Sequence, residues 1–425
     1  MSIANTFSAH TVTEDLGDII VDHLRANKPQ LRLAIVTETY PPEINGVALT
    51  IARFVDGLKL IGHDVEVIRP RQSKSDAANS QELLLRGLPI PRYPHLKMGL
   101  PAKNALIKRW SLHRPDVVHI VTEGPLGYSA LQAALKLKLP VTSDFRTNFH
   151  AYSAHYGVGW LKRPIFAYLR KFHNQTYATM VPTDTLRAEL QALGFQRLQV
   201  VARGVDTALF HPQWRNESLR ASWGANAATP VAIYVGRIAP EKNLHTLIAA
   251  FKSMKAIDAR IKLVLVGDGP ARSEIEALLP EAIFTGLKRG KSLSAHYASG
   301  DIFLFPSLTE TFGNVIPEAM ASGLAVVAYD YAAAAQLIRH QASGLLATYN
   351  NKDAFVAAAA AVIRDFSQAH LWRVAARKAA ETLNWDRLVG ELEAVFTDAA
   401  AGARQPLITT IQSSKNRIFL PNHTS

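Results

Sequence analysis

The chain has 425 residues, of which 48% are hydrophobic and none is cysteine, and its net charge is +12. This length exceeds the ~150 residues of an ordinary domain and predicts two or three domains, while the lack of cysteine excludes disulfides, thiolate catalysis and cysteine-based metal sites. No stretch approaches the ~20 apolar residues that span a bilayer and no basic leader precedes an apolar core, so we expect a cytoplasmic protein.

Strand and helix patterns alternate along the first half of the chain. Residues 1–30 form a polar lead-in that we expect to be peripheral. Apolar runs that alternate with amphipathic segments are typical of buried parallel strands covered by helices. The predicted strands are 31–37, 64–69, 117–122, 141–144, 180–182 and 198–202, and the predicted helices are 47–61, 126–138 and 161–177.

The same alternation begins again in the second half. The predicted strands are 231–236, 261–267, 282–285, 302–306 and 325–329, and the predicted helices are 244–254, 271–279, 292–298, 315–322 and 352–365. Two such series predict an α/β chain of two facing, doubly wound, Rossmann-like domains. Their predicted bounds are 31–203 and 204–384, with a linker at 205–230, a further helix at 385–400 and a loosely ordered tail at 401–425.

The positive charge is concentrated in one quarter of the chain. Residues 86–182 contain 14 Lys/Arg and 3 Asp/Glu, a balance of +11. Such a surface attracts phosphates of lipid head groups, nucleic acid or an anionic substrate. The alternative is an ordinary solvated basic surface, but the acid-free stretches 86–115 and 145–183 are also rich in aromatic residues.

Part of this stretch has the composition of a segment that lies at a membrane surface. Residues 160–172, WLKRPIFAYLRKF, mix apolar and cationic side chains. Lys103, Lys108, Arg109 and Trp110 add to the same character. We therefore expect residues 86–183 to contact an anionic membrane. No nucleic-acid-binding module is recognisable, so we expect no nucleic-acid partner; the oligomeric state is left open.

Two glutamates mark the strongest candidate site. Glu310 and Glu318 lie eight positions apart, on either side of a Gly-Asn turn that follows a predicted strand and begins a helix. A loop carboxylate can accept hydrogen bonds from sugar hydroxyls, Glu318 can accept them from a ribose, and the free N–H groups of a helix start suit a phosphate. The alternative for Glu318 is a favourable interaction with the helix dipole, but its apolar neighbours argue against a solvated surface helix.

Two cations and a glycine turn follow other strands of the second half. Arg237 and Lys242 come after the strand 231–236, at the carboxyl end where parallel sheets bind ligands. They could hold a diphosphate and stabilise it as it leaves; the alternative is a surface ion pair with Glu241. Gly267 allows a close backbone approach, either to a ligand or within a plain tight turn.

The first half offers two loops with candidate residues. Gly46 precedes a predicted helix and would let the chain pass close to a phosphate or sugar. Its loop matches neither the dinucleotide fingerprint nor the lysine-bearing phosphate loop, which argues against a dehydrogenase and an ATPase. After the strand 141–144, Arg146 and His150 lie among aromatic residues, and a histidine there could orient a hydroxyl or relay a proton. No histidine has acidic companions at metal-ligand spacing, so we expect no metal.

Together these motifs resemble the retaining glycosyltransferases of the GT-B architecture. The resemblance covers residues 31–400 and points to the large bacterial and plant group of mannosyl-, glucosyl- and sulfoquinovosyl-transferases, the glycosyl transferases group 1. It is carried by Glu310 and Glu318 with Phe312-Gly313 between them, by Gly236-Arg237 and Glu241-Lys242, and by Gly204-Val205-Asp206.

The resemblance implies a role for each matching residue. Arg237 and Lys242 should hold the donor's diphosphate, Glu310 the transferred sugar and Glu318 the ribose, and Gly46 should close over the phosphates. The helix 385–400 should cross back to the first domain. Further donor-binding residues are expected to be Gly236, Gly267, Phe312, Gly313 and Asn314.

One loop departs from the pattern of the family. Relatives often have histidine where this chain has Arg146 before Thr-Asn-Phe149, and that histidine usually helps to position the donor sugar. Either Arg146 does so with a different sugar preference, or His150 takes over.

The resemblance also implies a reaction. A hexose should pass from a UDP- or GDP-linked sugar, with retained configuration, to a lipid such as diacylglycerol at the cytosolic face of the membrane. No cofactor or metal should be needed, and front-face substitution is expected because no enzymic nucleophile is evident. The alternatives are transfer to a soluble sugar or polysaccharide precursor, and an epimerase or phosphorylase on the same architecture.

Overall fold

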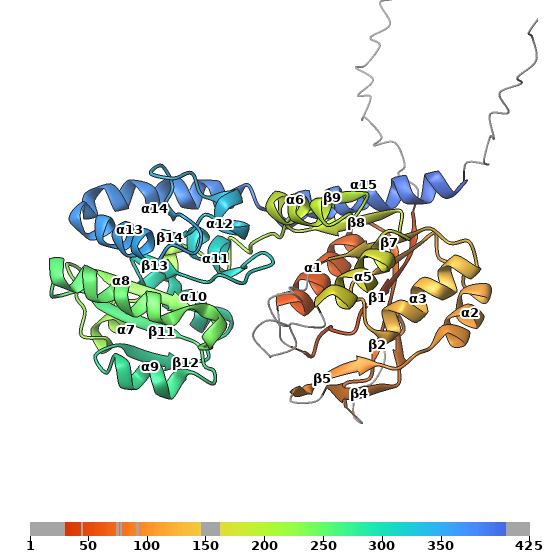
Figure 1. Cartoon of the computed structure of the whole chain (residues 1–425), viewed down its shortest axis with the longest axis horizontal. Coiled ribbons are helices and arrows are strands. Elements are labelled where there is room, and N and C mark those ends of the chain that lie inside the picture. Colours follow the sequence, from red (N-terminus) through yellow and green to blue (C-terminus); the bar gives the residue numbers. More distant parts are fainter. Residues whose placement is uncertain are drawn as a thin grey trace, which may run out of the picture. The chain divides into compact units, whose positions relative to one another are not determined.

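The computed structural model describes residues 30–43, 46–73, 76, 79–90, 93–145 and 162–404, and every structural statement here concerns those residues (Figure 1). The chain divides into a short unit, Met1–Gln30, and a large unit, Leu31–Ser425. All of the helices and strands below belong to the large unit.

The first half of the large unit contains a seven-stranded parallel sheet. Its strand order is β3-β2-β1-β6-β7-β8-β9. From β1 the chain adds β2 and β3 on one side and β6 to β9 on the other, so the boundary between β1 and β6 is a topological switch point. The strands are β1 (Arg32–Val36), β2 (Asp64–Pro70), β3 (Glu82–Leu85), β6 (Val117–Ile120), β7 (Val141–Asp144), β8 (Ala178–Val181) and β9 (Leu198–Val200).

Helices cover both faces of this sheet because successive residues of each strand point to opposite sides. Leu33 of β1 packs in one core cluster with Phe54 of α1, whereas Ala34 packs in another with Leu106 and Trp110 of α2. The helices are α1 (Gly46–Leu60), α2 (Lys103–Leu112), α3 (Pro125–Lys136), α5 (Lys162–His173) and α6 (Asp184–Ala192), and a hairpin joins β4 (Gly87–Ile90) to β5 (Tyr93–Gly99).

The second half contains a six-stranded parallel sheet of order β12-β11-β10-β13-β14-β15, with its switch point between β10 and β13. The strands are β10 (Val231–Val235), β11 (Lys262–Val266), β12 (Ile283–Gly286), β13 (Ile302–Phe305), β14 (Ala325–Tyr329) and β15 (Leu345–Ala347). The helices are α7 (Glu217–Ser222), α8 (Leu244–Ile257), α9 (Arg272–Leu278), α10 (Gly290–Ser299), α11 (Val315–Ala321), α12 (Ala332–Leu337), α13 (Lys352–Arg364) and α14 (Phe366–Glu381).

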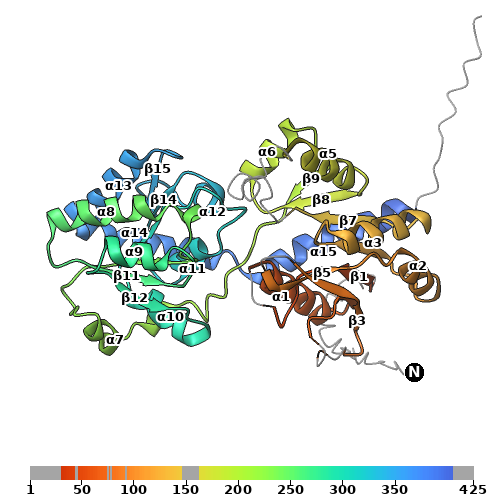
Figure 2. The same ribbon diagram turned by 60° about the horizontal axis from the view of Figure 1, so that its bottom comes forward.

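The last described helix, α15 (Trp385–Arg404), returns to the first sheet, as Figures 1 and 2 both show. Leu392 and Phe396 belong to the same core cluster as β1, β2 and α1. At the start of the helix, the rings of Trp385 and Phe54 meet edge to face with centroids 5.5 Å apart. The predicted fold class is therefore confirmed: two doubly wound α/β halves and a helix that crosses back.

A buried polar cluster ties α7 and α14 to the second sheet. Asp301, just before β13, accepts hydrogen bonds from Arg220 (3.1 Å), Arg215 (3.0 Å) and Arg373 (3.3 Å). It also accepts one from the backbone N–H of Val231. Since Arg220 has no exposed surface and Asp301 is 4% exposed, this carboxylate compensates the buried charge of Arg220.

Several elements differ from the sequence prediction. Residues 70–116, left without elements, contain β3, the β4–β5 hairpin and α2, and the predicted linker 205–230 contains α7. Helix α15 includes residues 401–404 of the expected tail; residues 405–425 lie outside the described part. Trp110 is not a surface aromatic, because it is fully buried under the first sheet, and Arg109 is paired with Glu66 at 2.7 Å.

Candidate functional site

Two loops meet at the switch point of the second sheet, one after β10 and one after β13. Nζ of Lys242 lies 2.5 Å from Oε1 of Glu310, and the hydroxyl of Ser307 donates to the same oxygen over 2.7 Å. Thr309 Oγ1 donates to the carbonyl of Glu241 over 3.2 Å. The structure therefore brings together Lys242, which is predicted to bind the diphosphate, and Glu310, which is predicted to bind the sugar.

The Lys242–Glu310 pair has a chemical consequence. The side chains of Lys242 and Glu310 are 18% and 16% exposed. The pair is therefore largely shielded from solvent but remains accessible to a ligand. Oε1 of Glu310 thus accepts hydrogen bonds from both an ammonium and a hydroxyl, the first of them charge-assisted. Glu310 therefore acts as a hydrogen-bond acceptor in this structure.

Arg237 lies in the loop after β10 and makes the ion pair considered as an alternative to phosphate binding. Its Nη1 is 3.2 Å from Oε1 of Glu241, and its side chain is 38% exposed. A pair this exposed contributes little to stability, so the guanidinium can exchange Glu241 for a doubly charged ligand at small cost. The hydroxyl of Tyr234 donates to the carbonyl of Arg237 over 2.9 Å and fixes the loop.

Gly267 has a packing role that the sequence did not reveal. A Cβ placed on Gly267 would lie 1.9 Å from the carbonyl oxygen of Gly236. The two glycines therefore allow the loops after β10 and β11 to touch, and the N–H of Ile238 completes the contact by donating to the carbonyl of Asp268. The close approach is between loops, so Gly267 supports the backbone that presents Arg237.

Glu318 lies on α11 and is half-buried. Burial raises its pKa to about 7, and a hydrogen bond from Tyr297 opposes that rise. The distance from the Tyr297 hydroxyl to Oε2 of Glu318 is 2.9 Å. A carboxylate poised between its two protonation states near neutral pH is unusual for a surface helix and is typical of functional sites.

The loop 312–314 lies against the first residue of α1. A Cβ placed on Gly46 would lie 3.1 Å from Nδ2 of Asn314 and 3.6 Å from Nη1 of Arg203. Gly313 has a φ of +93°, which a side chain would strain, and Phe312 is buried. Of the predicted site residues, Arg146 and His150 lie outside the described part of the chain.

Sequence analysis missed two glutamates at the switch point of the first sheet. Glu38 follows β1 and accepts from the N–H of Leu126 over 3.0 Å; burial raises its pKa to about 7. Glu123 follows β6, and its Oε1 lies 3.1 Å from Nε2 of His173. The only indication in the sequence was that each glutamate follows one of the two strands, β1 and β6, that border the switch point.

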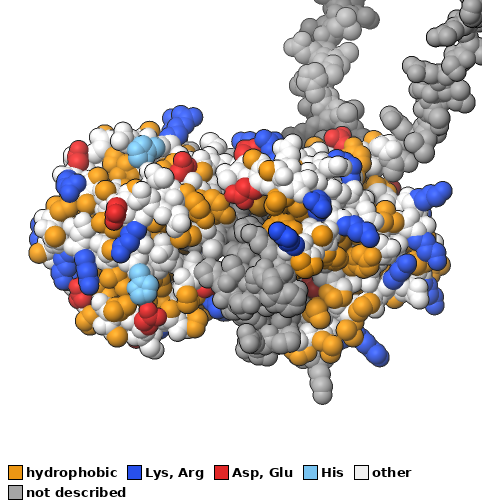
Figure 3. Space-filling view, viewed as in Figure 1, with side chains coloured by type: hydrophobic (Ala, Val, Ile, Leu, Met, Phe, Trp, Pro, Cys, Tyr) orange, Lys and Arg blue, Asp and Glu red, His pale blue; other side chains and the backbone are white. Residues whose placement is uncertain are grey.

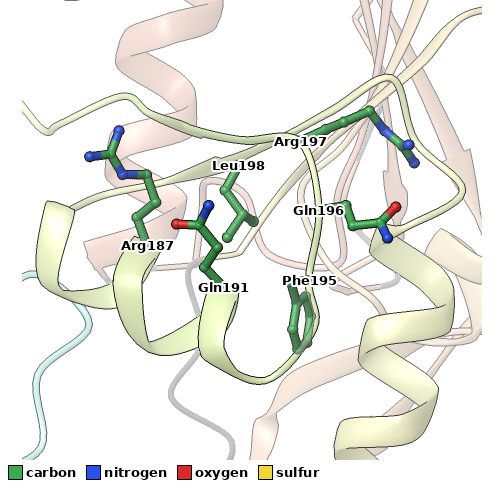
Figure 4. A pocket seen from close by; sticks show the side chains of 6 residues that line it. All are labelled: Arg187, Gln191, Phe195, Gln196, Arg197 and Leu198. Carbon is green, nitrogen blue, oxygen red and sulfur yellow. The ribbon is translucent and has the colours of Figure 1, made fainter.

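No group of three or more His, Asp or Glu among the described residues could hold a metal ion. A cavity of about 350 Å³ lies at α6 and β9 and is lined by Arg187, Gln191, Phe195, Gln196, Arg197 and Leu198, which Figure 4 labels. It includes none of the residues discussed above. Arg187 is paired with Asp184 at 2.8 Å, and Arg197 donates to the carbonyl of Thr176, so we assign it no role in the reaction.

The fold and the loops at the second switch point define a GT-B glycosyltransferase. The sequence profile described as "Glycosyl transferases group 1" matches residues 229–365, and the one described as "Glycosyltransferase Family 4" matches residues 44–209. The chain belongs to the group 1 glycosyltransferases, and it is a hexosyltransferase.

Similar proteins include a mannosyltransferase and an enzyme named for a glucolipid. A GDP-mannose-dependent alpha-mannosyltransferase of Mycolicibacterium smegmatis is 34% identical over 86% of this chain and 98% of the relative. An alpha-monoglucosyldiacylglycerol synthase of Acholeplasma laidlawii is 29% identical over 70% of this chain and 80% of the relative. The structure of Anabaena HepE in complex with UDP-glucose has a TM-score of 0.66 and 17% identity, covering 86% of this chain and 100% of the other.

Proposed function

We propose that this enzyme transfers a hexose from a UDP- or GDP-linked sugar, with retention of configuration, to a lipid acceptor such as diacylglycerol. The observation that carries the donor half of this proposal is the meeting of Lys242 and Glu310 beside Arg237 at the switch point of the second sheet. Ligands of open α/β sheets bind at this place. The names of the relatives, which include a GDP-mannose-dependent enzyme, support a nucleotide-sugar donor.

Each residue has a proposed part in the reaction. A diphosphate would draw Lys242 and Arg237 away from Glu310 and Glu241 and would be stabilised by both cations as it leaves. Glu310, released from Lys242, would accept hydrogen bonds from the hexose, and Glu318 from the ribose. Two side-chain cations would serve in place of a metal, and no cofactor is needed. Because no enzymic nucleophile is evident in the sequence, we propose front-face substitution rather than a covalent intermediate.

The acceptor is proposed from the surface of the first half. Helix α5 exposes Arg163, Arg170 and Lys171 beside Tyr168, which is 40% exposed. Figure 3 shows Lys and Arg side chains dispersed among hydrophobic ones over the part of the molecule that holds α2 and α3. A surface of this kind suits the interface of an anionic membrane. The diacylglycerol named for one relative supports a lipid acceptor.

The same surface suggests where the enzyme acts. In the described part of the chain, no helix is long and apolar enough to cross a membrane. We propose that the enzyme binds peripherally to the inner face of the plasma membrane, through charge attraction and shallow insertion of aromatic side chains.

The test is a panel of UDP- and GDP-sugars offered to purified enzyme with vesicles that contain diacylglycerol. We expect one donor to yield a hexosyl lipid by mass spectrometry, with the anomeric configuration of the donor by NMR. Transfer to free sugars but not to lipid would contradict the proposed acceptor, and an inverted product would contradict retention.

A second test addresses the membrane. The enzyme should float with vesicles that contain anionic lipid and be released by salt, since screening weakens surface attraction. The variant Arg163→Gln/Lys171→Gln should float less, and Lys255→Gln, on an exposed residue of α8, should behave as wild type. Equal binding to neutral and anionic vesicles would refute the electrostatic part of the proposal.

A further inference from the structure

Asn243 lies between the two loops of the candidate site, although the sequence motifs did not single it out. It follows Lys242 and directly precedes α8, and its φ of +56° lies in the left-handed region, which asparagine tolerates better than most residues. An asparagine before a helix usually caps the first backbone N–H groups with its side chain. The Asn243 side chain instead bonds to the next loop and to the hydroxyl of Thr246.

These bonds connect the ends of three neighbouring strands. Nδ2 of Asn243 donates to the carbonyl of Pro306, after β13, over 3.2 Å, and its Oδ1 accepts from the hydroxyl of Thr246 over 3.0 Å. Burial raises the pKa of Tyr329, the last residue of β14, and hydrogen bonds with Thr246 and Asn243 oppose that rise. Because β10, β13 and β14 are neighbours in that order, one side chain ties their carboxyl ends together.

Two further bonds cross between the loops after β10 and β13. Lys242 contacts Glu310, and Thr309 donates to the carbonyl of Glu241 over 3.2 Å. The proposed function requires the first contact to open, because a bound diphosphate draws Lys242 away from Glu310. The bonds of Asn243 and Thr309 join neutral groups, for which a phosphate competes less strongly than for an ammonium. Once the donor is bound, the register of the two loops therefore depends on Asn243 and Thr309.

We propose that Asn243, assisted by Thr309, is a positioning residue that holds Lys242 and Glu310 in register while the donor lies between them. The inference rests on the proposed function, because it takes Lys242 to bind the diphosphate and Glu310 the hexose. In this role Asn243 acts through the two loops and makes no contact with the reacting atoms. Small displacements of such loops matter, because a shift of about 1 Å can cost 10²-fold in rate.

A merely structural role for Asn243 makes a different prediction. Free UDP or GDP needs only the loop of Lys242, whereas the intact donor needs both loops at once. Loss of register should therefore impair turnover of the donor more than binding of the free diphosphate. If Asn243 only stabilises the start of α8, its loss should lower the melting temperature and leave the kinetics of the folded enzyme unchanged.

The experiment compares wild type with Asn243→Gly, Thr309→Val and Asn350→Gly. Glycine keeps the left-handed backbone but removes the bonds of Asn243. Asn350, an exposed residue with a φ of +58°, is the matched control for the same backbone change. The measurements are kcat and KM with the donor and acceptor that support turnover, Kd for free UDP or GDP by calorimetry, and Tm by circular dichroism.

We expect Asn243→Gly to lower kcat/KM for the donor by about 10–10²-fold and to weaken the free diphosphate far less. Thr309→Val should show the same pattern to a smaller degree, because it removes one bond between the loops. Asn350→Gly should match wild type in both measurements.

Two results for Asn243→Gly would overturn the inference and leave the proposed function intact. One is wild-type kinetics, and the other is a loss of donor turnover matched by an equal loss of affinity for the free diphosphate. If Asn243→Gly does not fold, Thr309→Val decides, and wild-type kinetics in that variant would overturn the inference. Wild type that binds neither UDP nor GDP would overturn the proposed function and this inference with it.

Discussion

The hydroxyl of Tyr297, on α10, donates a hydrogen bond to Oε2 of Glu318, on α11, over 2.9 Å. Tyr297 has no exposed surface, so its hydroxyl cannot turn to water instead. Burial raises the pKa of Glu318 to about 7, and this hydrogen bond opposes the rise. Glu318 therefore gains or loses its charge close to neutral pH. The proposed hydrogen bonds to the ribose should depend on pH in the same range.

Replacing Tyr297 with Phe should move the pH dependence of nucleotide binding upward. Only ionised Glu318 accepts two hydroxyl donors, so affinity for UDP or GDP should fall as the pH drops through 7 in wild type. Without the tyrosine hydroxyl, the pKa of Glu318 rises further, and the fall should begin at higher pH. Calorimetric titrations from pH 5.5 to 9 measure the shift. Glu318→Gln should bind weakly with no such transition, and an unshifted profile in Tyr297→Phe would be inconsistent with this role.

Replacing Lys242 with Met should reduce kcat by about 10²–10³-fold, the size of effect seen when one electrostatic contact to a transition state is lost. The KM for the donor should rise as well, since a cation of the ground-state complex is also removed. Steady-state kinetics with the preferred donor measure both. Lys255→Met is the matched control, because that lysine pairs with Glu281 at 3.3 Å on an exposed surface. Unchanged turnover in Lys242→Met would exclude the donor site described above.

Replacing Asp301 with Asn should destabilise the fold by about 3–5 kcal/mol, the cost of breaking a buried ion pair from one side. Arg220 and Arg373 would then remain near one another without a carboxylate between them, and burial already lowers the pKa of Arg373. Urea unfolding measures the loss. Asp258→Asn, in a pair whose Arg260 side chain is 67% exposed, should lower the midpoint far less. A similar midpoint for both variants would show that the cluster is dispensable.

Replacing Glu38 with Gln should flatten the dependence of stability on pH. Burial raises the pKa of Glu38 from 4.5 to about 7, and the nearby charge of Glu123 adds to this rise. Between those values the unfolded chain gives up a proton that the folded chain keeps, so wild type loses stability as the pH rises from 4.5 to 7. Glutamine cannot ionise, so that loss should shrink by at most about 3 kcal/mol.

Urea unfolding at pH 4.5 and pH 8 measures the effect of Glu38→Gln. Glutamine can still accept the N–H of Leu126, so the helix start should be preserved. Glu276→Gln, at an exposed glutamate paired with Arg272, should keep the wild-type difference between the two pH values. If Glu38→Gln shows the same difference in stability between pH 4.5 and pH 8 as wild type, Glu38 is not the group that makes stability depend on pH.

The sequence predicted the buried strands well and the pairings between loops poorly. Runs such as 302–305 are apolar on both faces, which only a central parallel strand requires. Helix α14 was missed because its many charged and small residues leave it with few large apolar side chains, and β15 because three residues are too few for a pattern. The β4–β5 hairpin was missed because Gly87 and Pro89 are unfavourable in strands.

The same division holds at the candidate site. Lys242 and Glu310 were each found from a local motif, yet they are 68 residues apart and meet only because β10 and β13 are neighbours. The pairing of β10 with β13 is set by the strand order of the whole sheet, and a short stretch of sequence does not predict that order. Arg203 and Glu38 stand in no motif, and only their positions after β9 and β1 bring them to the loops.

The return of α15 to the first sheet has a consequence for biosynthesis. Leu388, Leu392 and Phe396 complete the apolar layer over β1, β2 and α1, yet they are made some 300 residues after those elements. On the ribosome, one face of the earliest sheet is covered by α1 but not by α15 until the polypeptide is almost finished. A fragment that stops at residue 384 should therefore aggregate, and supplying residues 385–404 as a separate peptide should rescue it.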